Sequence, residues 1–214
     1  MSNLLKPLAL AAIGLCVSAA AWADSFTNPS FETGNVNGWT VQGSVSVQSS
    51  VTGATGVTVN PTQGSYFGYL TSCCVYGLMP GYTDGSTLSQ ELDLAAGQKI
   101  SFDWFWNSYD YLPFNDAAFV TINGVSTMLD NIAQAGSNGA TTGWNTYTFT
   151  VPSAGEYEVQ VGVFNNLDNG VNSFLGVDNF QVSAAPAVPE PSSLALLGTG
   201  LIGGVGILRR KFAL

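Results

Sequence analysis

Alternation of apolar and polar residues constrains the fold of this 214-residue chain more than any other feature. The segments ISFDWFW (100–106), TYTFTV (146–151) and EYEVQVGVF (156–164) all alternate with a period of two. That period is typical of a strand with a single buried face. Asn123-Gly124 stands between two apolar runs and indicates a tight hairpin turn. Because no long segment between residues 24 and 183 follows a helical period, the sequence predicts an all-β fold for this part of the chain.

The alternating segments lie within residues 24–183, which we expect to form one domain. A domain of about 160 residues can bury a sizeable core. Short strands separated by Gly, Asn, Pro and Ser are typical of a β-sandwich, and we predict one of the jelly-roll type. The following residues, 184–191, read AAPAVPEP and predict an extended linker.

Composition excludes several classes of function. The chain contains no histidine, which removes Ser-His-Asp and Cys-His catalysis and His-ligated zinc. Between residues 24 and 188 there are 13 carboxylates and a single cation, Lys99. Because phosphate contacts need Lys and Arg, we expect no binding of nucleic acid. Divalent cations and neutral sugars are compatible with this acidity.

The N-terminus predicts a secretory signal peptide over residues 1–23. Lys6 is followed by an apolar run that ends in the small-x-small triplet Ala21-Trp22-Ala23. This order is typical of export signals, and we expect cleavage after Ala23.

The C-terminus predicts a single transmembrane helix within residues 192–214. Residues 192–208 carry no charge and reach the lower limit of length for crossing a bilayer. Arg209, Arg210 and Lys211 follow directly, and such cations keep a tail on the cytoplasmic side. We therefore expect the domain on the outer side of the inner membrane.

This tail resembles the PEP-CTERM sorting signal. The triplet Pro189-Glu190-Pro191, a Gly-rich apolar span and the pair Arg209-Arg210 occur in the order typical of that family. The resemblance implies recognition by exosortase, a membrane protease, and removal or exchange of the tail near the triplet. The inner-membrane anchor is then transient, and we expect the mature protein at the cell surface or outside the cell.

The two ends of the domain resemble jelly-roll domains of the carbohydrate-binding-module and galactose-binding type. The matching stretches are NPSFETGNVNGWTV (28–41) and FLGVDNFQVS (174–183). The resemblance implies a structural Ca²⁺ site that holds the first strand to the last. The ligands carried over are the Ser30 carbonyl, the Glu32 and Asp178 carboxylates, and carbonyls near Gln63 and Ser65. An alternative stays open, in which the two carboxylates only cap turns by accepting from backbone N–H groups.

A first candidate sugar site lies on the outward faces of two predicted strands. We expect Trp104 and Trp106 to be buried in the core, so the opposite face of segment 100–106 is free to bind a ligand. An aromatic ring beside Asp and Asn can stack on a sugar while the polar groups bind its hydroxyls. The predicted ligand-binding residues on this face and on a second strand are Asp103, Phe105, Asn107 and Phe164.

A second candidate site lies in two loops rich in Asp and Asn. The first loop contributes Asp110, Asn115 and Asp116, and the second contributes Asn165, Asp168 and Asn169. These side chains suit a second calcium ion or sugar hydroxyls, although the spacing is not that of an EF-hand. The alternative is that they are ordinary turn residues.

Cys73 and Cys74 are adjacent, and the third cysteine lies in the predicted signal peptide. A disulfide between neighbours is strained, because adjacent Cα atoms lie about 3.8 Å apart. We expect this vicinal disulfide; two free thiols, or a bond to another chain, are the alternatives.

Together these features predict a non-catalytic protein of the cell surface or extracellular matrix that associates with exopolysaccharide or another surface glycan. One alternative is a self-assembling adhesin of biofilms that binds no sugar. Another is a glycoside-active enzyme that uses paired carboxylates. Since no carboxylate pair lies in a recognisable catalytic motif, we expect no enzyme.

Overall fold

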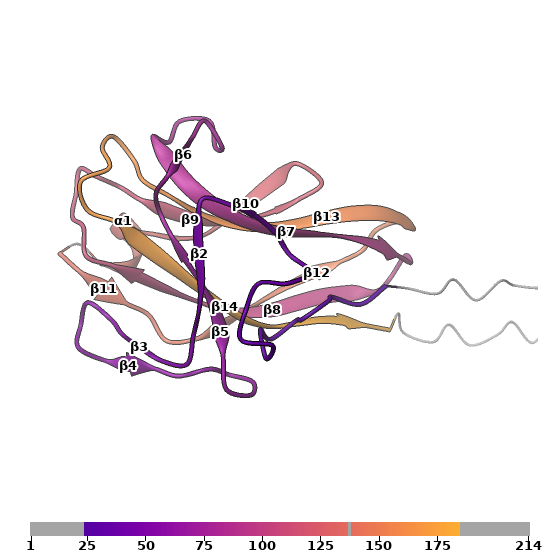
Figure 1. Cartoon of the computed structure of the whole chain (residues 1–214). Helices are drawn as coiled ribbons and strands as arrows, with labels where there is room; N and C mark the ends of the chain where they lie inside the picture. Colours follow the sequence, from indigo (N-terminus) through magenta and orange to yellow (C-terminus); the bar gives the residue numbers. More distant parts are fainter. Residues whose placement is uncertain (1–23, 137, 185–214) are drawn as a thin grey trace, which may run out of the picture.

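The computed structural model describes residues 24–136 and 138–184. They form two antiparallel β-sheets that lie face to face (Figure 1). The first, sheet A, has the order β1-β7-β13-β9-β10, with β6 also paired to β7. Its strands are β1 (Thr40–Gln42), β6 (Val75–Tyr76), β7 (Asp84–Leu94), β9 (Ala117–Ile122), β10 (Val125–Asn131) and β13 (Gly155–Phe164).

The second, sheet B, has the order β11-β8-β14-β5-β2, with β12 also paired to β8. Its strands are β2 (Ser44–Gln48), β5 (Phe67–Thr71), β8 (Lys99–Ser108), β11 (Ala140–Thr141), β12 (Asn145–Thr150) and β14 (Ser173–Ser183). A short hairpin of β3 (Val51–Thr52) and β4 (Thr58–Val59) and a short helix, α1 (Ile132–Ala135), complete the described elements. The predicted all-β sandwich is confirmed.

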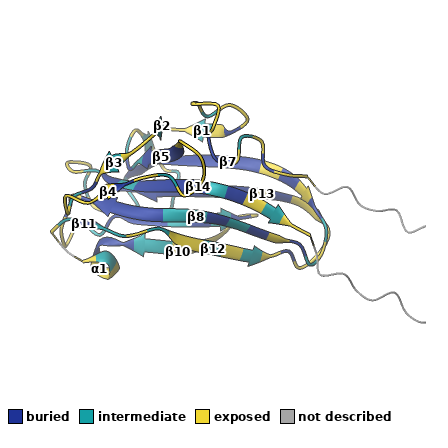
Figure 2. Ribbon diagram, turned by 90° about the horizontal axis from the view of Figure 1, so that it is seen from below, coloured by how far each residue is buried: buried dark blue, intermediate teal, exposed yellow. Residues whose placement is uncertain are grey.

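The two inner faces enclose the core that the alternation predicted. Phe102 and Trp106 of β8 are fully buried, and Trp104 is partly buried against the same cluster. On β13 the positions from Val159 to Val163 alternate between this core and the outer face. Figure 2 shows the buried residues concentrated along the central strands, with the exposed ones at the edges and loops. The expectation that the two tryptophans belong to the core is therefore confirmed.

The predicted hairpin joins β9 to β10. Asn123 and Gly124 have φ angles of +48° and +77°. Asn and Gly adopt this left-handed region more readily than other residues, which is why the pair is typical of tight turns.

The two ends of the sandwich differ. The first and last described residues lie at the same end of the sandwich (Figure 1). The opposite end, here called the loop end, is built from residues 72–83, 109–116 and 165–172. The predicted signal peptide, the sorting tail and most of the linker lie outside the described residues. Within the described part of the chain, no helix is long and apolar enough to cross a membrane.

Candidate functional site

The outer face of sheet A carries a row of polar side chains. Strand register places five residues side by side across β1, β7, β13, β9 and β10, namely Thr40, Ser89, Gln160, Thr121 and Ser126. The hydroxyls of Thr121 and Ser126 lie 2.8 Å apart. The row faces away from the core because the alternate positions, such as Leu88 and Val161, point inward.

Three aromatic rings continue this face toward the loop end. Tyr82 packs edge-on against Phe119 with ring centroids 5.5 Å apart, and both side chains are partly exposed. Phe164 contacts both rings and is 1 % exposed. Gly85 and Gly162 leave room for it, since a Cβ at either position would come within 2.7 Å of its ring. Phe164, predicted to bind ligand, is instead buried beneath the two partly exposed rings of Tyr82 and Phe119.

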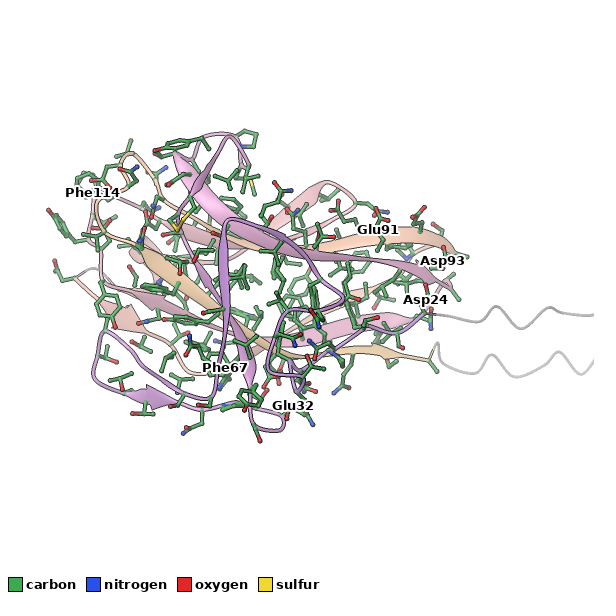
Figure 3. All side chains as sticks on the ribbon, viewed as in Figure 1. Asp24, Glu32, Phe67, Glu91, Asp93 and Phe114 are labelled. Atoms are coloured by element: carbon green, nitrogen blue, oxygen red, sulfur yellow. A yellow bond between two sulfur atoms is a disulfide. The ribbon has the colours of Figure 1, made fainter. Side chains whose placement is uncertain are left out.

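A polar hollow of about 360 Å³ lies beside the row. Its lining residues are Thr27, Gly38, Thr40, Ser89, Gln90, Glu91 and Glu158. Glu91 and Glu158 are exposed and stand directly opposite each other on β7 and β13; Figure 3 labels Glu91 toward the end where the chain enters and leaves. Like charges in this position destabilise a sheet. The charges of this pair therefore do not stabilise the sheet, and both side chains are exposed to solvent.

The sequence analysis predicted a sugar-stacking ring on the outer face of sheet B. Other parts of the domain cover this face. Phe105 is 0 % exposed. Its ring packs against Phe67, Tyr69 and Trp144, with centroid distances of 5.6, 6.0 and 4.7 Å. The β3–β4 hairpin adds Val59 to the same cluster. The prediction for Phe105 is corrected accordingly: the segment between β2 and β5 folds over this face and makes it a second hydrophobic core.

The predicted polar neighbours of Phe105 bind other parts of the domain, and Asn107 helps to hold the covering segment in place. Asn107 is 1 % exposed; its side chain donates to the Tyr69 hydroxyl at 2.7 Å and accepts from the Ala54 N–H at 2.9 Å. Asp103 accepts from the Thr146 hydroxyl at 2.7 Å. Because Asn107 is buried and both side chains bind other parts of the domain, we no longer assign them to a ligand.

The loop end brings together three of the predicted acidic side chains, Asp110, Asp116 and Asp168. Asp116 is fully buried and accepts from the Asn166 N–H at 2.8 Å and the Ser173 hydroxyl at 2.7 Å. Burial raises the pKa of Asp116 to about 7 despite these hydrogen bonds, and the charges of Asp110 and Asp168 add to the rise. Burial also raises the pKa of Asp110. The three carboxyl groups thus lie close together, and burial opposes the ionisation of Asp110 and Asp116.

The three predicted asparagines of these loops bind other protein groups. The Asn115 side chain accepts from a backbone N–H of α1 at 2.9 Å. Asn169 donates to the Tyr76 hydroxyl at 3.0 Å. Asn165 is fully buried and donates to the Asp84 carboxylate at 2.9 Å. Their roles match the interpretation as turn residues and structural polar groups.

The residues of the predicted calcium site lie around segment 62–66. Glu32 accepts from the backbone N–H groups of Ser65 and Tyr66, at 2.9 and 3.0 Å. Asp178 is fully buried and accepts from two further N–H groups of the segment at 2.8 and 2.9 Å. Burial raises the pKa of Asp178, and these hydrogen bonds oppose the rise.

The hydrogen bonds to Glu32 and Asp178 are those expected of carboxylates that cap turns, rather than of carboxylates that bind a cation. Calcium needs oxygen ligands directed at it, whereas Gln63 and Ser65 direct N–H groups at the two carboxylates. Ser30, which lies two positions before Glu32 in the sequence, is buried. Across residues 24–136 and 138–184, no group of three or more His, Cys, Asp or Glu side chains is placed to share one metal ion. Calcium binding at Glu32 and Asp178 stays a prediction. Unfolding of a Glu32 variant with and without calcium tests it.

We expect Glu32→Ala to lower the free energy of unfolding by about 1–2 kcal/mol, because segment 62–66 loses its charged acceptor. The loss should be equal in calcium and in excess EGTA when measured by urea unfolding. Glu156→Ala removes an exposed carboxylate from β13, and this control should change stability by less than about 0.5 kcal/mol. A loss that appears only with calcium would instead establish the calcium site.

Cys73 and Cys74 form a disulfide with an S–S distance of 2.10 Å, visible as the yellow bond in Figure 3. The Cys74 N–H donates to the Asp84 carboxylate at 3.0 Å, and the Cys73 carbonyl accepts from the Ser86 hydroxyl at 3.0 Å. The disulfide is therefore tied to the first residues of β7.

Sequence reasoning missed the residues that form the open face of sheet A. Alternation along β9 and β13 already directs Thr121 and Gln160 outward, and it also directs Phe119 to the same side. That signal was present in the sequence. It does not reveal which outward face stays open to solvent.

Similar solved structures include carbohydrate-binding modules and an adhesin domain. TmCBM61, solved with β-1,4-galactotriose, is 19 % identical, with a TM-score of 0.45 over 75 % of this chain and 98 % of that one. The CBM22-1 xylan-binding domain of Paenibacillus barcinonensis Xyn10C is 15 % identical, with a TM-score of 0.38 over 79 % and 100 %. The K1 cleaved adhesin domain of Lys-gingipain from Porphyromonas gingivalis W83 is 15 % identical, with a TM-score of 0.45 over 78 % and 100 %. Likeness of this degree supports no conclusion about a ligand.

No curated protein matches the sequence. The family described as the PEP-CTERM protein-sorting motif matches residues 187–211, which lie outside the described residues. The match includes the predicted triplet Pro189-Glu190-Pro191 and the pair Arg209-Arg210. That motif indicates export and sorting to the cell surface. The chain is thus an exported β-sandwich protein that carries the PEP-CTERM protein-sorting motif.

Proposed function

We propose that the domain is a non-catalytic sugar-binding module of the jelly-roll type that holds a surface glycan or exopolysaccharide on the outer face of sheet A. The observation that carries the proposal is the order of side chains along this face. The aromatic pair Tyr82 and Phe119 is followed by the polar row that contains Gln160, and then by Glu91 and Glu158 at the hollow.

This order matches the chemistry of a sugar chain. A sugar ring has an apolar face, which stacks on an aromatic ring, and a rim of hydroxyls, which pair with amides, hydroxyls and carboxylates. Phe119 pairs with Gly162, four residues from Glu158 on β13. At about 3.3 Å per residue, the aromatic and acidic ends of the face lie about 13 Å apart. That length suits a chain of several neutral sugars.

The sorting motif supports the setting of this function. We propose exosortase as the processing partner and the inner membrane as a transient anchor before processing. The mature domain then meets glycans at the cell surface or in the matrix outside the cell.

We expect specific, saturable binding on a glycan array, followed by titration with the best ligand. Gln160→Ala and Phe119→Ala should each weaken affinity at least about tenfold, equivalent to about 1.4 kcal/mol. The matched control is Gln181→Ala, which removes an exposed glutamine from β14 of sheet B and should leave affinity unchanged.

Other outcomes would point to other functions. A blank array together with concentration-dependent oligomers would favour the self-assembling adhesin. Binding that survives both substitutions would place the glycan on another surface. Release of sugar products from a bound glycan would show an enzyme and contradict the proposal.

A further inference from the structure

One carboxylate oxygen at the loop end has no hydrogen-bond partner. Asp110 is 2 % exposed, and its Oδ2 is buried without a donor among the described residues. Its Oδ1 accepts from the Tyr111 N–H at 2.8 Å. A buried charged oxygen without a partner costs a large share of its hydration free energy, so native proteins seldom retain one.

Other buried carboxylates of the same region are fully partnered. Asp84 is 5 % exposed, and its two oxygens accept at 2.9 and 3.0 Å. Both oxygens of Asp116 also accept, at 2.8 and 2.7 Å. The fold therefore supplies donors to buried carboxylates at this end, and Asp110 is the exception.

The neighbours of Asp110 do not neutralise its charge either. Its carboxylate lies close enough to Asp116 and Asp168 for their negative charges to act on one another. The single basic residue of the described chain is Lys99, at the start of β8, whereas Asp110 follows the end of that strand. At about 3.3 Å per residue, the two are separated by about 30 Å.

We propose that Asp110 and Asp116 bind one Ca²⁺ ion at the loop end, with Asp110 Oδ2 as a ligand and Asp168 at the rim. The proposal is independent of sugar binding. The site needs only two carboxylates, because calcium also binds hydroxyl, amide, carbonyl and water oxygens. The hydroxyls of Ser108 and Ser173 lie 2.9 Å apart beside Asp116 and supply neutral oxygens there.

The cation would connect both ends of segment 109–116. Asp110 precedes its turn and Asp116 leads into β9, so one ion bound to both closes this loop. Such a site lies apart from Glu32 and segment 62–66, and the two are distinguishable by substitution.

The test is binding of Ca²⁺ alone to the full chain, purified in detergent and stripped of metal with EDTA that is then removed. Titration calorimetry should show binding by the parent protein. Its melting temperature should rise by about 5 °C at a hundredfold excess over Kd. Asp110→Asn should abolish this rise. Without metal it should melt at the same temperature as the parent or higher, because it loses a buried, unpartnered charge.

Three further variants complete the experiment. Asp116→Asn should also abolish the rise, whereas Glu32→Gln and Asp93→Asn should keep it; Asp93 is exposed and lies near the end where the chain leaves (Figure 3). Absence of binding by the parent overturns the proposal, as does a rise that survives Asp110→Asn. A rise lost only in Glu32→Gln would assign the ion to the other site. A metal-free Asp110→Asn protein that melts below the parent would show that Oδ2 already has a stabilising partner.

Discussion

Replacing Phe105 with alanine is expected to lower the free energy of unfolding by about 3–5 kcal/mol and to leave glycan affinity unchanged. The ring is fully buried among Phe67, Tyr69 and Trp144, and truncating a buried phenylalanine removes transfer free energy and leaves a cavity. Urea unfolding measures the loss, and glycan titration below the transition measures affinity.

Two matched substitutions sharpen this prediction. Phe114→Ala, in the partly exposed loop residue labelled in Figure 3, should cost well under half as much stability. Phe119→Ala should instead weaken glycan binding at least about tenfold. Phe105→Ala could instead keep the stability of the parent and lose glycan affinity. That result would place the sugar on sheet B, as the sequence analysis predicted, and would contradict binding on the outer face of sheet A.

Asn165→Ala is the second change with a large expected effect, a loss of about 3 kcal/mol or more. The Asn165 side chain donates to the Asp84 carboxylate at 2.9 Å and also bonds to both the hydroxyl and the carbonyl of Ser72. It therefore joins three separate stretches of chain at the loop end. Its removal leaves a buried carboxylate oxygen and a buried carbonyl without donors, which costs more than the net value of the bonds themselves. Thermal or urea unfolding measures the change.

Asn172→Ala provides the control, because Asn172 is partly exposed and receives one bond from Asn165 at 3.2 Å. Its loss should stay near 1 kcal/mol. Asn165→Asp should be worse than alanine at neutral pH, since two carboxylates would then meet in a buried place, and lowering the pH should relieve part of the loss. Equal stability of Asn165→Ala and Asn172→Ala would show that the buried network adds little.

Local sequence was sufficient to predict the strands and the side chains that they direct into the core between the two sheets. The alternation along 100–106 assigned Phe102 and Trp106 to the core, and the structure buries both completely. The Asn123-Gly124 turn was also predictable from the sequence, because its backbone conformation depends on the two residues themselves. These features follow from interactions within a few residues.

Local sequence did not predict which outer face of the sandwich stays open to solvent. Phe105 and Phe119 both point outward from their strands, and nothing in their immediate neighbours distinguishes them. They differ because the segment between β2 and β5 covers one of them, where Trp144 donates to the Asn60 carbonyl at 2.8 Å across 84 positions of sequence. The cover of a sheet face is a long-range contact, so the periodicity of a strand carries no record of it.

The sequence by itself determined the sorting motif, the all-β fold and the absence of histidine chemistry, since each depends on residue type and order alone. Only the tertiary structure decided which carboxylates have donors. Asp178 accepts from an N–H 116 positions away, whereas Asp110, of the same residue type and also in a turn-rich region, has a buried oxygen without a donor. Burial and hydrogen bonding of this kind are set by contacts between distant segments, and they are the reason why we propose a cation site at Asp110.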